Sequence, residues 1–131
     1  MDTARAMNEL SGSIIGASIE VHRTLGPGLL ESVYEECLCR ELTLKAISFK
    51  RQVPLPVAYK GVDLNCGYLQ DIVVDDAVIV ELKSVEHVSR LHKAQLLTYL
   101  RLSDRWLGLL INFNVPVLTE GVERIVNGEP R

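Results

Sequence analysis

The segment Asp71-Ile72-Val73-Val74-Asp75-Asp76-Ala77-Val78-Ile79-Val80-Glu81-Leu82-Lys83 decides the fold that we predict for this chain. Two apolar stretches flank a polar turn, which indicates a β-hairpin. Residues two apart in a strand point to the same face, so Glu81 and Lys83 share one face of the second strand. Charged side chains on a buried sheet face are costly unless they are paired, solvated or bound to a metal. The hairpin therefore predicts a polar site on an otherwise apolar sheet.

The register of the hairpin decides whether Asp71 joins Glu81. If the turn is centred on Asp76, Asp71 lies opposite Glu81, with Cβ atoms about 4.5–5.5 Å apart. Like charges in this position destabilise a sheet unless a cation lies between them, which favours a divalent metal. If the turn consists of Asp75 and Asp76 alone, Asp71 shares its face with Val80 and the site does not form. The simpler alternative is a pair of solvated charges at strand ends.

Composition and length indicate one folded domain that spans residues 1–131. Hydrophobic residues make up 47% and charged residues 24% of the chain, as in ordinary globular proteins. The net charge of −3 argues against a dedicated nucleic-acid binder with a basic stripe, but it is compatible with a nuclease whose carboxylates hold metal. An odd number of cysteines, three, favours the reducing cytoplasm over a disulfide framework. We expect neither a signal peptide nor a membrane span.

Periodicity predicts the elements in the order helix, helix, three strands, helix, strand. The helices are expected near residues 5–24, 29–44 and 89–102. The second helix has an expected core stripe of Leu30, Val33, Tyr34, Cys37, Leu38 and Leu42.

The strands are predicted from a change to a period of two after residue 48. Pro54 and Pro56 interrupt the first strand and demote it to an edge of the sheet or to a partly unpaired position. Alternating residues from Val62 to Tyr68 are expected to lead without a break into the hairpin. Residues 106–113 form a continuous apolar strand of the buried type, and residues 122–126 add a short final strand. This order predicts an α/β sandwich on a mixed central sheet.

Four further residues could belong to the site, and each has an ordinary structural explanation. Lys83 is either an edge lysine that discourages aggregation or a cation that stabilises phosphate charge. Glu31 lies in the first turn of the second helix, where any acid complements the helix dipole. Gln95 and Tyr99 are four apart on the third helix and share a face. Because its neighbours are apolar, we expect Gln95 to be an inward-facing amide with its hydrogen bonds satisfied.

The segment Gly28-Leu29-Leu30-Glu31-Ser32-Val33-Tyr34 resembles the signature of the GxxExxY proteins, which are placed in the PD-(D/E)xK nuclease superfamily. The similarity extends from about residue 14 to 127, and residues 107–114 resemble the late strand of that family. The resemblance implies a restriction-endonuclease-like core.

The resemblance also implies roles for the candidate residues. Asp71 matches the metal-binding acid of the superfamily, and Glu81-Leu82-Lys83 matches its Glu-x-Lys. Gln95 and Tyr99 resemble the Gln-x-x-x-Tyr motif of RecB-type nucleases. Glu31 resembles the first-helix acid that completes the metal shell in that branch.

The implied function is hydrolysis of phosphodiester bonds in nucleic acid, with DNA as the expected substrate and Mg²⁺ or Mn²⁺ as the cofactor. Asp71, Glu81 and Glu31 would hold the metal, and Lys83 would position water or phosphate. A homodimer is expected if two strands are engaged. One residue departs from the family: an Arg commonly lies two positions before the Asp, where this chain has Leu69. The alternative is therefore a catalytically weak or inactive nuclease-fold module that acts through interactions.

Overall fold

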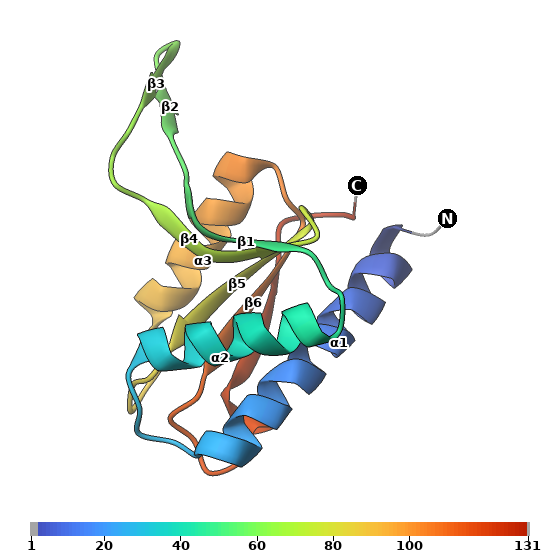
Figure 1. Cartoon of the computed structure of the whole chain (residues 1–131). Coiled ribbons are helices and arrows are strands. Elements are labelled where there is room, and N and C mark those ends of the chain that lie inside the picture. The colour runs from blue at the N-terminus through green and yellow to red at the C-terminus, as the bar shows by residue number, and fades with distance from the viewer. Residues whose placement is uncertain (1–2, 131) are drawn as a thin grey trace.

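A computed structural model describes residues 3–130 of the chain (Figure 1). A five-stranded sheet with the order β1-β4-β5-β6-β7 forms its centre. β5 and β6 run parallel and the other neighbouring strands run antiparallel, so the sheet is mixed as predicted. The strands are β1 (Phe49–Pro54), β4 (Leu69–Val74), β5 (Val78–Lys83), β6 (Leu107–Asn112) and β7 (Val122–Val126). β1 lies at the edge of the sheet, where prolines are tolerated.

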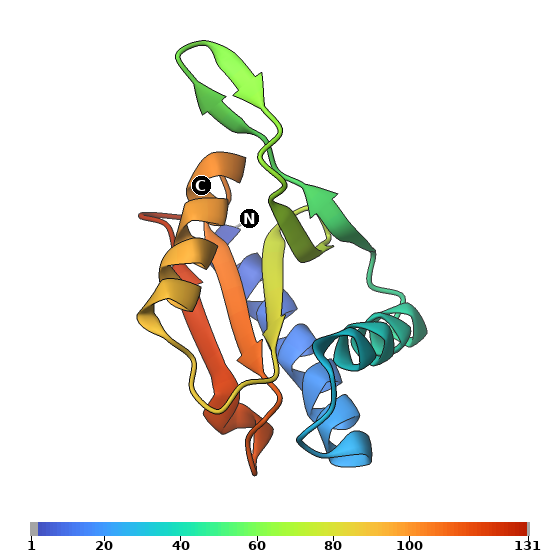
Figure 2. The same ribbon diagram turned by 90° about the vertical axis from the view of Figure 1, so that its left-hand side faces the viewer.

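Helices cover both faces of the sheet (Figure 2). α1 (Thr3–Leu25) and α2 (Glu31–Leu44) pack on one face, α3 (Arg90–Ser103) packs on the other, and a short 3-10 helix, η1 (Leu118–Gly121), precedes β7. α3 begins with a capping box, in which the Ser89 hydroxyl accepts from the His92 N–H and the His92 ring accepts from the Ser89 N–H. Within residues 3–130, no helix is long and apolar enough to span a bilayer.

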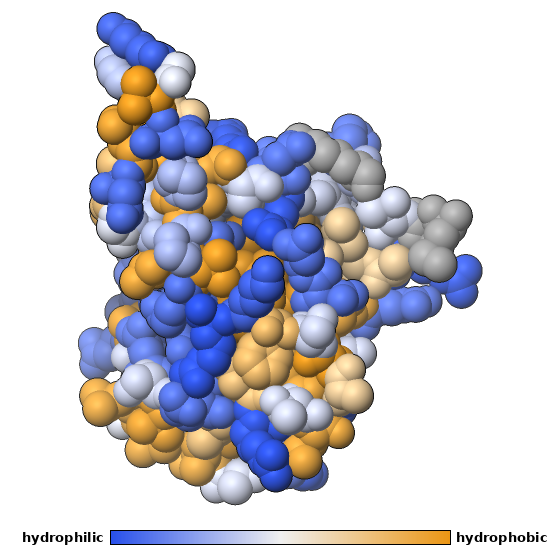
Figure 3. All heavy atoms as spheres, turned by 45° about the horizontal axis from the view of Figure 1, so that its top comes forward, coloured by the Kyte–Doolittle hydropathy of each residue, from blue (hydrophilic) through white to orange (hydrophobic). Residues whose placement is uncertain are grey.

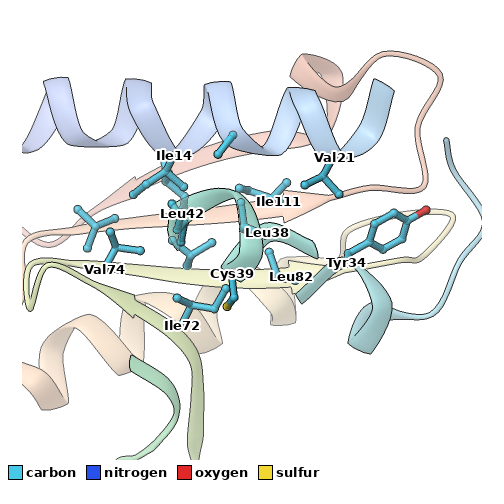
Figure 4. Packing of buried hydrophobic residues seen from close by; sticks show 14 of the residues in the cluster. Ile14, Val21, Tyr34, Leu38, Cys39, Leu42, Ile72, Val74, Leu82 and Ile111 are labelled. Atoms are coloured by element: carbon cyan, nitrogen blue, oxygen red, sulfur yellow. The ribbon is translucent and has the colours of Figure 1, made fainter. Parts of the chain in front are cut away.

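The two faces of the sheet bury different side chains. The larger core lies between the sheet and α1 and α2 (Figure 4). It contains even-numbered residues of the hairpin, such as Ile72 and Leu82, packed against Tyr34 and Leu38. The smaller core, around Leu96, includes the odd-numbered hairpin residue Ile79, together with Tyr99, Leu100 and Leu110. Since side chains alternate along a strand, the odd-numbered positions of the hairpin face α3.

The predicted core stripe of α2 is partly wrong. Tyr34, Leu38 and Leu42 are fully buried as expected. However, Leu30 is 73% exposed because it caps the helix from outside its first turn, and Val33 is 37% exposed. Cys39, which the prediction left out, is buried instead.

The predicted continuous strand from Val62 to Val74 is also wrong. β2 (Val57–Tyr59) and β3 (Val62–Leu64) pair only with each other, and residues 65–68 form no strand before β4 begins. Gly67 has a φ of +80°, a left-handed conformation that ends an extended run. Residues 57–64 therefore form a two-stranded arm that projects from the sheet (Figure 1). The alternating pattern is real, but it cannot tell which sheet a strand joins.

Candidate functional site

The hairpin has the register that brings the two acids together. Ile72 is the partner of Val80, so the turn is centred on Asp76 and Asp71 lies opposite Glu81. The alternative with a two-residue turn is wrong. Both acids lie at odd-numbered positions, and therefore on the face of the sheet that α3 covers.

Backbone hydrogen bonds across the strands hold both carboxylates in place. The Asp71 N–H donates to Glu81 Oε2 at 3.0 Å, and the Leu82 N–H donates to Asp71 Oδ2 at 2.9 Å. Each acid thus accepts from the strand that carries the other. Among the described residues, neither acid takes part in a salt bridge.

Burial makes this pair unfavourable when both acids are charged. Glu81 is 7% exposed. The pKa of Glu81 is raised to about 9. Burial is the largest cause, followed by the charge of Asp71 and by a hydrogen bond between the two carboxyls. The nearby charge of Lys83 lowers this pKa but only in part offsets the burial. At neutral pH the pair therefore retains a proton or attracts a cation.

Lys83 and Tyr99 border the same pair. Lys83 follows Glu81 by two positions on the same face and is half-buried. Tyr99 is 4% exposed and packs from α3 onto the same face of the sheet as the pair. The pKa of Tyr99 is raised to about 12 by burial first and then by the charges of Glu81 and Asp71. Its hydroxyl is therefore protonated over the whole physiological range of pH.

Gln95 lies where the sequence did not place it. Its side chain is exposed and lines a pocket of about 390 Å³ beside α3, so the prediction of an inward-facing, satisfied amide is wrong. The reason is that α3 contacts the sheet through Leu96, Tyr99 and Leu100, and Gln95 lies beside these contacts at the exposed edge of the helix. The pocket also includes Tyr68, whose ring centroid is 5.4 Å from that of Tyr99. Sequence reasoning missed Tyr68, although a tyrosine three residues before a candidate ligand was a signal.

Glu31 is not gathered with the other two acids. It is the exposed first residue of α2, which packs on the opposite face of the sheet. Within the described chain, no group of three or more His, Cys, Asp or Glu side chains could hold a metal ion. The start of α2 does reach the end of β5, because the Ser84 hydroxyl donates to the Leu29 carbonyl at 2.6 Å. The structure thus brings together Asp71, Glu81, Lys83 and Tyr99, with Glu31 outside this group.

The helices on the two faces differ in charge. α3 contains Arg90, Lys93 and Arg101 and no acidic residue. α2, on the other face, contains four glutamates and one arginine. Although the net charge of the whole chain is −3, the helix beside the candidate site is basic. Such segregation is typical of a surface that contacts phosphates.

A mixed sheet between helix layers, with opposed acids on its central hairpin, is the architecture of restriction-endonuclease-like folds. A family model described as PD-(D/E)XK nuclease superfamily matches residues 8–125, from α1 to β7. The chain therefore belongs to the PD-(D/E)XK nuclease superfamily. Neither the curated proteins nor the solved structures gave a significant match.

Proposed function

We propose that this protein is a metal-dependent nuclease that hydrolyses phosphodiester bonds in DNA, and that it belongs to the GxxExxY branch of its superfamily. The observation that carries the proposal is the opposed pair of half-buried Asp71 and buried Glu81, which forms no salt bridge with any described residue. A buried acid opposite a second acid is costly to keep unless a bound group uses it. Membership of a nuclease superfamily supports the same conclusion.

The donor set suits Mg²⁺ or Mn²⁺. Both side chains offer hard carboxylate oxygens, and Mg²⁺ is commonly held by one or two carboxylates while it keeps several waters. Asp71 and Glu81 would therefore be sufficient protein ligands, and Glu31 would act from the start of α2 as an outer ligand or base. A bound cation would supply Lewis-acid activation of water and of the scissile phosphate.

The neighbouring side chains would act on the substrate. Lys83 would stabilise negative charge that develops on the phosphate, because its ammonium shares a face with Glu81. Tyr99, protonated at physiological pH, would donate a hydrogen bond to a phosphate oxygen or to water. Gln95 would contact the substrate from the neighbouring pocket. The basic character of α3 favours a polyanionic substrate.

The alternative is a nuclease-fold module that binds partners without catalysis. Leu69 favours it, because this exposed first residue of β4 stands where the family commonly has an arginine. The site then lacks one cation that could bind phosphate.

The test of the enzyme is a cleavage time course on labelled single- and double-stranded DNA with Mg²⁺, Mn²⁺ or EDTA. We expect Lys83→Ala to lose roughly a hundred- to a thousand-fold in rate, as is usual for one lost transition-state contact. The matched control is Lys45→Ala, at the far end of α2, which should cleave like the wild type. Equal cleavage by Lys83→Ala and the wild type would contradict the proposed site. A wild type that cleaves nothing would favour the module.

We also propose that the protein acts in the cytoplasm as a single domain and forms a homodimer. Cys37, Cys39 and Cys66 are all free, as a reducing compartment requires. Sedimentation velocity with and without a DNA duplex would test the dimer, and a monomer in both conditions would exclude it.

A further inference from the structure

Apart from Gln95, the residues that line the pocket beside α3 have no role in the proposed hydrolysis. With a volume of about 390 Å³, it lies between Tyr68 at the base of the arm and the N-terminal half of α3. Leu91, which is 78% exposed, and Ala94 give it apolar surface. Ser89, His92, Gln95 and Thr98 complete the lining. A flat, partly apolar group the size of one nucleoside would fit this space.

The pocket adjoins the candidate site through two aromatic rings. Tyr68 contacts Tyr99 at 5.4 Å between ring centroids, with the planes tilted by 57°. Tyr99 in turn borders Asp71 and Glu81. Tyr68 also precedes Asp71 by only three residues. If a phosphate of a nucleic-acid strand bound at the acids, a neighbouring nucleotide of that strand would therefore lie over the pocket.

Two polar side chains of the pocket are available to a ligand. Ser89 and His92 are engaged with each other in the capping box of α3. In contrast, the side chains of Gln95 and Thr98 make no hydrogen bond to any described residue. A glutamine amide both donates and accepts, so it can pair with the hydrogen-bonding edge of a base.

We propose that this pocket binds an unpaired nucleobase, and that the substrate is therefore single-stranded nucleic acid or a frayed end. Tyr68 offers a ring face for stacking, and Gln95 meets the edge of the base. In a duplex both faces of a base are covered by its neighbours, so only an unstacked base can enter. Arg90 and Arg101 lie along the same helix and attract the backbone of the strand, whereas Lys93 is paired with Glu123 at 3.0 Å. This inference rests on the proposed function for its choice of substrate.

The test measures binding without cleavage. Fluorescence anisotropy in EDTA compares a labelled 12-nucleotide single strand with the matching blunt duplex, using full-length protein. We expect the wild type to bind the single strand at least about ten-fold more tightly than the duplex. Tyr68→Ala should weaken single-strand binding by roughly 5- to 100-fold, the usual effect of losing one stacked base. Tyr68→Phe keeps the ring and should bind like the wild type.

Tyr59→Ala tests whether the loss of any exposed tyrosine weakens binding, because Tyr59 lies on the arm outside the pocket and is 59% exposed. We expect its single-strand affinity to match that of the wild type. Equal affinities of the wild type for the single strand and the duplex would overturn the proposal that the pocket binds a base. Equal losses of single-strand affinity in Tyr68→Ala and Tyr59→Ala would also overturn it. Binding of free dAMP without binding of the strand would also overturn it.

The outcome is separable from that of the cleavage assay. Single-strand binding that depends on Tyr68, with no cleavage in Mg²⁺ or Mn²⁺, would reject the proposed nuclease activity but support base binding in the pocket. Cleavage that depends on Lys83, with no preference for binding single strands, would support the nuclease activity but reject base binding in the pocket.

Discussion

At the scale of single residues, Glu81 should control how stability depends on pH. Its pKa rises from an ordinary 4.5 to about 9 on folding, chiefly because it is buried. A carboxyl whose pKa is raised by folding stabilises the protein fully below its unfolded pKa, and that contribution disappears as the pH rises through the folded pKa.

We therefore expect the Tm of the metal-free protein to fall as the pH is raised from about 4.5 to about 9. Glu81→Gln cannot ionise, so its Tm should change much less across this range. Thermal denaturation in EDTA at several pH values measures both proteins. Parallel curves would show that Glu81 is not the group responsible.

Stabilisation of the protein by Mg²⁺ should depend on Asp71. At a concentration of Mg²⁺ one hundred times its Kd, binding to the folded state stabilises a protein by about 2.7 kcal/mol. We expect Mg²⁺ to raise the Tm of the wild type but not of Asp71→Asn. Above a pH of about 9, where both acids are charged, Asp71→Asn should also be more stable than the wild type without metal, because it removes one of two repelling charges.

Asp63→Asn is the matched control for this measurement, since Asp63 lies on the exposed arm. It should respond to Mg²⁺ like the wild type. An equal metal response in Asp71→Asn would place the ion elsewhere.

At the scale of elements, Gly121 allows η1 to pack closely on the end of β6. A Cβ at this position would lie 2.1 Å from the backbone carbonyl oxygen of Asn112, a distance that requires the backbone to move. We expect Gly121→Ala to lower the free energy of unfolding by roughly 1–3 kcal/mol, the usual cost of overpacking. Urea denaturation measures the change.

Gly16 provides the opposite case within the same experiment. It lies inside α1, and a Cβ there would meet nothing within 4 Å. Gly16→Ala should therefore raise stability by roughly 0.5–1 kcal/mol through the better helix propensity of alanine. Destabilisation by Gly16→Ala, or none by Gly121→Ala, would contradict the packing described for these two elements.

At the scale of the whole molecule, stability should be concentrated in the sheet and low in the arm. Every residue of β5 except Lys83 is buried and all of β6 is buried, whereas β3 is exposed throughout. The apolar side chains of Val62 and Leu64 lie open to solvent, and Figure 3 shows apolar surface on the arm. An isolated two-stranded hairpin is only marginally stable in water.

Amide hydrogen exchange should therefore proceed rapidly in residues 57–64 and slowest in β5 and β6. The comparison is made in metal-free protein near neutral pH. Arm amides as protected as those of β5 would show that a partner, such as a second copy of the chain, covers the arm.

The sequence by itself determined the features that depend on local periodicity. The polar turn and the period of two limited the hairpin to two registers, because a strand allows only two faces. One of them places Asp71 opposite Glu81, and the structure has that register. Prolines at positions 54 and 56 put β1 at the edge, since they cannot donate to a neighbouring strand. The apolar run after residue 106 became the buried strand β6 for the same local reason.

Only the tertiary structure decided which elements meet. Periodicity shows that Glu81 shares a face with Lys83, but the packing of α3 on that face is what brings Tyr99 to the acids. In the same way, packing of α2 on the opposite face left Glu31 exposed and outside the pair. The pairing of β2 with β3 turned an apparent strand into an arm and set Tyr68 beside α3. These contacts join residues far apart in the chain, so they depend on how whole surfaces fit together and leave no local pattern in the sequence.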